Sequence, residues 1–217
     1  APHAARAVGL VAAGGLFNAG QCVAAPSRVP YAARLAAALI DAVAKRMSAP
    51  VAGPPFAPGV QMGPLTSRAQ YERVKRYVAQ GKADGARHVT GGETPDGPGY
   101  FIRPALFADV PADSALWREE IFGPVLCVRT FDTEGDAIAA ANDTEYGLVA
   151  TVVTRDAARG KRVADALEAG VVWINTPQLI YPQTSWGGYK RSSVGRELGP
   201  FGLAAFQEIK QVMMPAC

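Results

Sequence analysis

The residues with the clearest chemical potential are the three cysteines, Cys22, Cys127 and Cys217. A cysteine thiolate can act as a nucleophile, bind a metal or form a disulfide. An odd number of cysteines at unrelated spacings argues against a disulfide framework and against a four-ligand zinc site. Because the two histidines, His3 and His88, lie far apart in the sequence, no metal site is expected. A reduced, cytoplasmic protein is the simplest interpretation of these cysteines.

Cys22 lies in a segment that is predicted to be a turn. It directly follows the turn-like stretch Asn18-Ala19-Gly20-Gln21, at the end of a buried helix expected over Ala4 to Phe17. A reactive thiol needs an electropositive, partly exposed setting, and the sequence does not display one. A free cysteine also serves often as a small buried hydrophobe, so both roles stay open for Cys22. Cys127 lies in an apolar run and is expected in the core.

The composition is that of an ordinary globular domain. Of the 217 residues, 49% are hydrophobic and 19% are charged, and the formal net charge is only +3. These values argue against a nucleic-acid partner, and the lack of an apolar run of about 18 residues argues against a membrane span. The chain also lacks a secretory signal and an initiator methionine, so we expect it to be trimmed, tagged or cut from something longer.

The first half of the chain shows mainly helical patterns. Apolar residues repeat at helical spacing from Tyr31 to Met47, and four prolines between Ala49 and Gly59 predict an extended loop. Ser67, with Gln70 three residues later, forms a capping-box pattern that predicts the start of a third helix.

The second half of the chain alternates strands and helices. Strands are expected over Val125 to Phe131, Leu148 to Thr154 and Val171 to Asn175, with helices over Thr133 to Asn142 and from Asp156 to Glu168. Apolar strands separated by helices are typical of a parallel sheet, so the sequence predicts one α/β domain over residues 1–217. A loop follows over Thr176 to Pro200, and Ile209 to Met214 is expected to form a final strand. Neither a glycine-rich dinucleotide fingerprint nor a phosphate-binding loop is present.

Six segments, taken together and in this order, resemble one family. They are Phe17-Asn18-Ala19-Gly20-Gln21-Cys22, Gly63-Pro64-Leu65, Tyr100-Phe101-Ile102-Arg103-Pro104, Glu119-Glu120-Ile121-Phe122-Gly123-Pro124-Val125, Asn142-Asp143-Thr144-Glu145-Tyr146-Gly147-Leu148, and Trp186-Gly187-Gly188-Tyr189-Lys190 with Gly195-Arg196-Glu197-Leu198-Gly199. The set looks like the catalytic domain of the NAD(P)-dependent aldehyde dehydrogenases. The segment around Trp186 is similar to the betaine and amino-aldehyde branch.

The resemblance implies a mainly parallel sheet flanked by helices, without the family's Rossmann cofactor domain. The family's full subunit is longer, and its N-terminal half holds the cofactor domain, the general-base glutamate and the oxyanion-hole asparagine. We therefore expect no cofactor for this chain alone, and NAD(P) if a cofactor-binding half completes it.

In the family reaction a cysteine thiolate attacks the aldehyde, hydride leaves to nicotinamide, and water hydrolyses the thioester. The family pattern is Gly-Gln, one variable residue, and then the nucleophile. Here Cys22 directly follows Gly20-Gln21, so Val23 occupies the nucleophile position, and counting back from Ser27-Arg28 gives the same result. Two readings follow: the nucleophile is lost, or the loop has slipped by one residue and Cys22 still points into the site.

Four further residues match positions of the family's site. The resemblance assigns Glu120 to the nicotinamide ribose, places the Phe122 ring beside the cofactor, and puts Asn175 on the floor of the site. Trp186 matches a residue that helps to form an aromatic cage around an ammonium group. Each also has a structural alternative: a loop that closes the domain for Glu120 and Phe122, a strand-end turn for Asn175, and a core or rim position for Trp186.

The favoured function is a repurposed domain with binding or non-redox activity that does not oxidise aldehydes alone. The alternative is the catalytic half of an NAD(P)-dependent aldehyde dehydrogenase, truncated or split from its cofactor half. Removing the family's neighbouring domain should expose an apolar face and a strand edge. We therefore expect a homodimer, or a partner that covers this face, with a small-molecule ligand possible and neither nucleic acid nor membrane as a partner.

Overall fold

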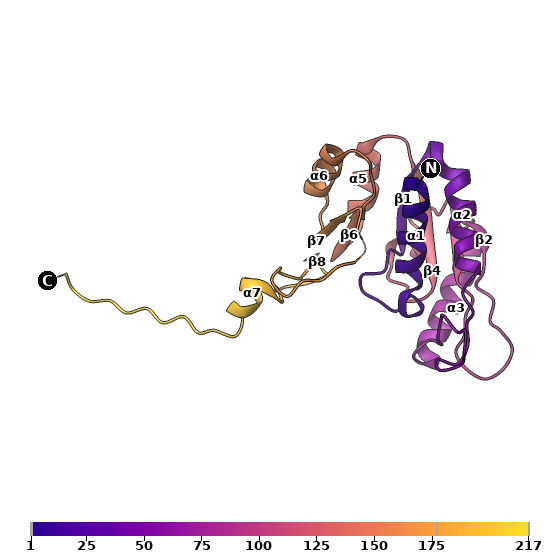
Figure 1. Cartoon of the computed structure of the whole chain (residues 1–217), viewed down its shortest axis with the longest axis horizontal. Coiled ribbons are helices and arrows are strands. Elements are labelled where there is room, and N and C mark those ends of the chain that lie inside the picture. Colours follow the sequence, from indigo (N-terminus) through magenta and orange to yellow (C-terminus); the bar gives the residue numbers. More distant parts are fainter. Residues whose placement is uncertain (1, 177, 217) are drawn as a thin grey trace.

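The larger lobe of the protein is built on a four-stranded sheet. In the computed structural model, which describes residues 2–176 and 178–216, the strand order is β1-β4-β3-β2 (Figure 1). The strands are β1 (Arg28–Ala32), β2 (Arg87–Thr90), β3 (Ala105–Ala108) and β4 (Val125–Phe131). Strands β1, β4 and β3 run parallel, and β2 joins the edge antiparallel to β3. The mainly parallel α/β fold predicted from the sequence is confirmed.

Helices cover both faces of this sheet. On one face, α1 (Pro2–Leu16) and α2 (Ala36–Ser48) pack against Leu106 and Leu126. On the other, α3 (Arg68–Ala83) and α4 (Ala115–Arg118) pack against Phe107 and Cys127. The alternation follows from strand geometry, because successive side chains point to opposite faces. All four residues of β3 are buried, as expected for an inner strand with helices on both sides.

A smaller unit follows β4 in the chain. Its parallel strands β6 (Val149–Val152) and β7 (Val171–Ile174) are accompanied by α5 (Glu134–Asn142) and α6 (Ala157–Ala166). Thr133 caps α5 with a full capping box, and the Asp156 side chain caps α6 by accepting a hydrogen bond from the Arg159 backbone amide. The two-residue strands β5 (Tyr146–Gly147) and β8 (Tyr189–Lys190) pair antiparallel. The predicted strands and helices of this region are therefore confirmed to within a few residues.

The start of the helix predicted over Tyr31 to Met47 is wrong. Arg28–Ala32 forms β1, the one-turn helix η2 (Ala33–Leu35) follows, and α2 begins only at Ala36. The residues of β1 become a strand because they pair with Cys127 to Phe131 of β4. Pro30 is tolerated there because β1 lies at the edge of the sheet.

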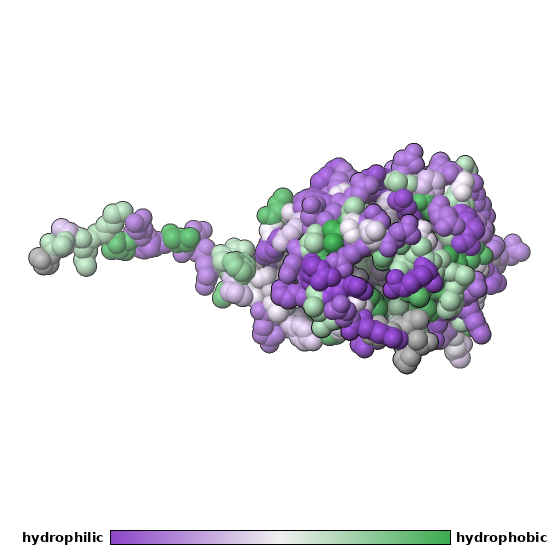
Figure 2. All heavy atoms as spheres, turned by 90° about the horizontal axis from the view of Figure 1, so that it is seen from above, coloured by the Kyte–Doolittle hydropathy of each residue, from purple (hydrophilic) through white to green (hydrophobic). Residues whose placement is uncertain are grey.

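The final strand predicted over Ile209 to Met214 is also wrong. After α7 (Gly199–Ala204) the chain runs away from the sheets as an extended tail (Figure 1 and Figure 2). Ile209 is 98% exposed and Met214 is 86% exposed, so neither side chain packs against a sheet. A β-branched, apolar composition favours an extended backbone, but a strand also needs an edge to pair with.

Candidate active site

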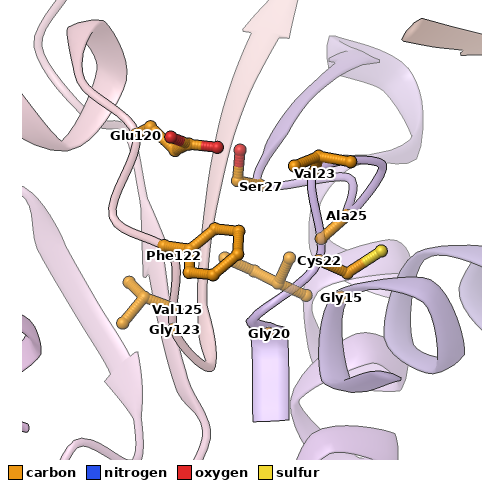
Figure 3. Close-up of a pocket in the computed structure, with 11 residues that line it drawn as sticks. Gly15, Gly20, Cys22, Val23, Ala25, Ser27, Glu120, Phe122, Gly123 and Val125 are labelled. Atoms are coloured by element: carbon orange, nitrogen blue, oxygen red, sulfur yellow. The ribbon is translucent and has the colours of Figure 1, made fainter. Parts of the chain in front are cut away.

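Two loops meet where β1 and β4 begin. One loop leads from α1 into β1 and carries Cys22 and Val23; the other leads into β4 and carries Glu120 and Phe122. Because β1 and β4 are parallel neighbours, the loops that enter them lie at the same edge of the sheet. They enclose a small cavity of about 50 Å³ (Figure 3). It is lined by Gly15, Gly20, Cys22, Val23, Ala25, Ser27, Glu120, Phe122, Gly123, Val125 and Leu126.

A turn of left-handed residues sets the path of the first loop. Asn18, Ala19 and Gly20, in the one-turn helix η1 (Phe17–Gly20), have φ angles of 50°, 55° and 73°. The side chain of Gln21 then fixes the loop at its base: its Nε2 donates to the Asn18 carbonyl (3.1 Å), and its Oε1 accepts from the Thr66 amide (2.9 Å). Left-handed backbone is costly for residues other than glycine, so these hydrogen bonds help to maintain it.

The two loops touch at a pair of glycines. A Cβ atom built on Gly20 would lie 2.1 Å from the Gly123 carbonyl oxygen, and one built on Gly123 would lie 2.4 Å from Cγ2 of Val74. Gly20 also has a positive φ, which glycine adopts without steric cost. The absence of two Cβ atoms therefore lets the Cys22 loop, the Phe122 loop and α3 stack closely.

Cys22 and Val23 present different faces to this cavity. Val23 is 58% exposed, whereas Cys22 is half-buried. In Figure 3 the Cys22 sulfur points away from the ring of Phe122, and Val23 lies on the same side of the cavity as Ser27. Both side chains line the cavity, so both interpretations of the loop are compatible with the lining.

Glu120 and Phe122 lie across the cavity from Val23. Glu120 is exposed, and Figure 3 shows its carboxylate directed toward the hydroxyl of Ser27. Phe122 is partly buried and has a φ of 58°, a left-handed conformation that costs a non-glycine residue about 1–2 kcal/mol. Side chains of α3 hold this loop from behind: Gln70 donates to the Ile121 and Phe122 carbonyls, and Arg73 donates to the Glu120 carbonyl.

Two side chains near the site have shifted acidities. Burial and a 2.6 Å hydrogen bond to Glu119 raise the pKa of Tyr77 to about 12, so its hydroxyl stays protonated and donates to that carboxylate. Burial alone raises the pKa of the Cys127 thiol to about 12, since the side chain is completely enclosed. Cys127 is therefore an inert core residue, as predicted. Cys217 lies outside the described residues.

The structure places Asn175 and Trp186 away from this cavity. Asn175 joins the ends of β6 and β7: its Oδ1 accepts from the Thr154 amide (2.9 Å), and its Nδ2 donates to the Thr154 carbonyl (2.6 Å). The Trp186 ring lies 6.1 Å from the Trp173 ring, centroid to centroid, and lines a second, more open cavity of about 370 Å³. The segment between them reaches the Cys22 loop through Gln178, whose Nε2 donates to the Ala24 carbonyl.

Some residues of the site carried no signal in the sequence. In the sequence, Ser27 only helps to locate the nucleophile position, and no motif points to Arg73. Gln70 was recognised only as part of a capping box. Its backbone amide does bond to the Ser67 hydroxyl (3.2 Å), but its side chain reaches the opposite loop. A helix-capping pattern cannot reveal a partner that is distant in sequence.

Two structural features are absent from residues 2–176 and 178–216: a membrane-spanning helix and a cluster of metal-ligating side chains. None of the helices there is long and apolar enough to cross a membrane. Nor do the histidine, cysteine, aspartate and glutamate side chains of these ranges form a group of three or more that could hold a metal ion.

Comparisons with known proteins identify relatives over nearly the whole chain. The model of the aldehyde dehydrogenase family matches residues 3–212. A chloroplastic betaine aldehyde dehydrogenase of Beta vulgaris is 41% identical over 92% of this chain and 40% of its own length. A peroxisomal aminoaldehyde dehydrogenase of Pisum sativum is 42% identical over the same shares. The chain therefore spans about 40% of the length of these curated relatives.

Solved structures agree with these matches. An aldehyde dehydrogenase from Bacillus cereus superposes with a TM-score of 0.92 at 40% identity, covering 94% of this chain and 42% of that one. A betaine aldehyde dehydrogenase from Staphylococcus aureus, solved in complex with NAD+, superposes with a TM-score of 0.89 at 36% identity, covering 93% and 41%.

Proposed function

The chain belongs to the aldehyde dehydrogenase family, and we propose that its site binds ligands non-covalently and does not oxidise aldehydes. In this proposal Val23 replaces the attacking thiol, while Glu120 and Phe122 keep the wall that faces a nicotinamide cofactor. The observation that carries the proposal is the placement of Val23, which lines the cavity and is 58% exposed, while the Cys22 sulfur points away from the ring of Phe122. Valine has no ionisable proton, so it forms neither a thiohemiacetal nor a thioester.

The residues present fit one wall of a cofactor site. The Glu120 carboxylate can accept hydrogen bonds from a vicinal diol, as in a ribose, and the Phe122 ring can pack against a flat heterocycle. The cavity of about 50 Å³ is smaller than the ~300–1,000 Å³ of a complete ligand pocket, so other residues must supply the opposite wall. When bound, NAD(P) supplies a hydride acceptor. The residues of this chain would orient it and exclude water, and would add no covalent step.

The first prediction concerns the purified 217-residue chain. Mixed with betaine aldehyde and either NAD+ or NADP+, it is expected to produce no reduced cofactor, because no thiol occupies the nucleophile position and the cofactor has only one wall to bind. The measurement is the absorbance of the reduced nicotinamide over time, with the betaine aldehyde dehydrogenase from Staphylococcus aureus as positive control. Steady formation of reduced cofactor above the protein-free rate would refute the proposal.

A second function is supported by the position of Cys22. The thiol lines the same cavity and is only half-buried, so a small rotation of the loop could turn it toward Phe122. In that case the chain would be the catalytic half of an NAD(P)-dependent aldehyde dehydrogenase. The two functions differ in one chemical property, which is whether an acyl group can be transferred to Cys22.

The ligand class we propose is a small molecule that carries a cationic nitrogen, such as an amino-aldehyde, which is bound without being oxidised. Two relatives at 41% and 42% identity are named betaine and aminoaldehyde dehydrogenases. Trp186 lines the second cavity of about 370 Å³, and its ring could attract an ammonium group there by about 0.5–2 kcal/mol. A cytoplasmic location is part of the proposal because Cys22 and Cys127 are free thiols, although the plant relatives are named as chloroplastic or peroxisomal.

We also propose that the C-terminal tail binds a second copy of this chain. Phe206, Ile209 and Met214 are 86–98% exposed, which is unfavourable for large apolar side chains in water. Light scattering at micromolar concentration is expected to give a mass above the 22.7 kDa of one chain. A variant that ends at Ala205 should be monomeric. If the full chain is itself a monodisperse monomer, this part of the proposal is wrong.

A further inference from the structure

We propose that Gln70 and Arg73 of α3 are positioning residues that hold Phe122 in the conformation that lines the cavity. Neither side chain lines the cavity itself. The inference deepens the proposed function and rests on it, because Phe122 is taken there as part of the wall that faces a ligand. The positioning itself can be tested without any ligand.

Three hydrogen bonds from α3 reach three consecutive backbone carbonyls. Gln70 Nε2 donates to Ile121 (3.0 Å) and to Phe122 (2.7 Å), and Arg73 Nη2 donates to Glu120 (2.6 Å). One turn further along the helix, Tyr77 donates to the Glu119 carboxylate (2.6 Å). The spacing of 70, 73 and 77 places these donors on one face of α3, opposite the loop. Each residue from 119 to 122 is therefore held by this helix.

The loop needs this support because its backbone is strained. Phe122 has a φ of 58°, and a strained residue persists only where its surroundings determine its conformation. Ile121 is 1% exposed and anchors the loop on one side, and Gly123 packs against Val74 of α3 on the other. Between these anchors, the bond from Gln70 to the Phe122 carbonyl fixes the peptide plane that follows the ring. Loss of this donor would let that plane rotate and move the ring.

The helix is a rigid base for these donors. Val74 is completely buried and Tyr77 and Val78 are nearly so, all three in the core cluster of the larger lobe. A site held by a packed helix is more precise than one held by other loops. The use of Gln70 is also unusual for its position. Its backbone amide donates to the Ser67 hydroxyl, but its side-chain amide donates to the loop. Departures from a local sequence rule are expected where a side chain serves a site.

The test compares two glutamines of the same helix. Gln70→Ala removes two of the hydrogen bonds to the loop, and the control Gln80→Ala removes a side chain whose amide donates to Asp84 at the end of its own helix. Hydrogen–deuterium exchange is measured for the amides of Ile121, Phe122 and Gly123. We expect Gln70→Ala to accelerate their exchange by about tenfold or more, and Gln80→Ala to leave it within about twofold.

A donor-retaining variant separates positioning from general packing. Gln70→Lys keeps a long side chain with N–H donors and is expected to restore exchange to within about threefold of the wild-type rate. Gln70→Glu has nearly the same shape as glutamine, but an ionised carboxylate only accepts hydrogen bonds, so this variant should resemble Gln70→Ala. Arg73→Ala should raise exchange at the same loop amides, and Arg73→Lys should restore it. Unchanged exchange in Gln70→Ala, or equal acceleration across the whole larger lobe, would overturn the inference. Aldehyde oxidation by the wild type would refute the proposed function and leave this result unaffected.

Discussion

Replacing Val23 by cysteine is expected to give the protein a single reactive thiol. The change is made in a background in which Cys22 and Cys217 are serine, so that Cys127 is the only other cysteine. Cys127 is completely buried with a pKa of about 12, and it should stay unmodified. Intact-mass analysis after brief exposure to p-nitrophenyl acetate should show one acyl group per chain in the Val23→Cys variant and none in its parent.

The matched control moves the thiol by one position. A variant that keeps Cys22 as its only thiol besides Cys127 should acquire the acyl group at least about tenfold more slowly, because its sulfur points away from Phe122 and is half-buried. Equal or faster acylation of Cys22 would show that the loop presents residue 22, and not residue 23, to a ligand in the cavity. The slipped-loop reading would then be correct.

Replacing Gly20 by alanine is expected to destabilise the protein by about 4 kcal/mol or more. The new Cβ would lie 2.1 Å from the carbonyl oxygen of Gly123, and backbone cannot move as a flexible side chain can. The φ of 73° adds the cost of left-handed backbone for alanine, about 1–2 kcal/mol. The two loops would have to separate, which breaks the cavity as well as the fold. Urea denaturation of both proteins measures the difference in the free energy of unfolding.

Gly59 provides the control for the backbone cost alone. It has a φ of 78°, and a Cβ built there meets nothing within 4 Å. Gly59→Ala is therefore expected to cost about 1 kcal/mol, since the left-handed penalty is partly offset by a stiffer unfolded chain. A similar loss in both variants would mean that the contact between Gly20 and Gly123 contributes nothing to stability.

The regular part of the fold could be predicted because its signals are local. Asp156 caps the helix that its side chain predicted, the helix expected from Thr133 to Asn142 is present, and β4 and β7 are short apolar runs between turn residues. The strand β1 could not be predicted in the same way. Its last two residues, Tyr31 and Ala32, fall within the helical pattern predicted as far as Met47, and only the long-range pairing with β4 makes Arg28–Ala32 a strand. Likewise, β2 and β3 are four-residue strands whose pairing has no local signal.

The residues of the site that belong to sequence motifs could be predicted, and those that act through contacts between distant segments could not. Cys22, Val23, Glu120 and Phe122 were identified from their motifs, and the structure brings all four to one cavity. The donors that hold the Phe122 loop come from a helix about 50 residues earlier in the chain, and no spacing rule connects them. The location also differs from the common rule for α/β sheets, since this cavity lies where β1 and β4 begin.

The most direct test of the central claim is the fate of the natural thiol. The wild-type protein is mixed with p-nitrophenyl acetate, quenched with acid at short times and mapped by peptide mass spectrometry at Cys22. If Val23 has replaced the nucleophile, Cys22 should be acylated more slowly than free N-acetylcysteine, with no burst of nitrophenolate. A stoichiometric burst, with the acyl group on Cys22 appearing faster than on the free thiol, would contradict this conclusion.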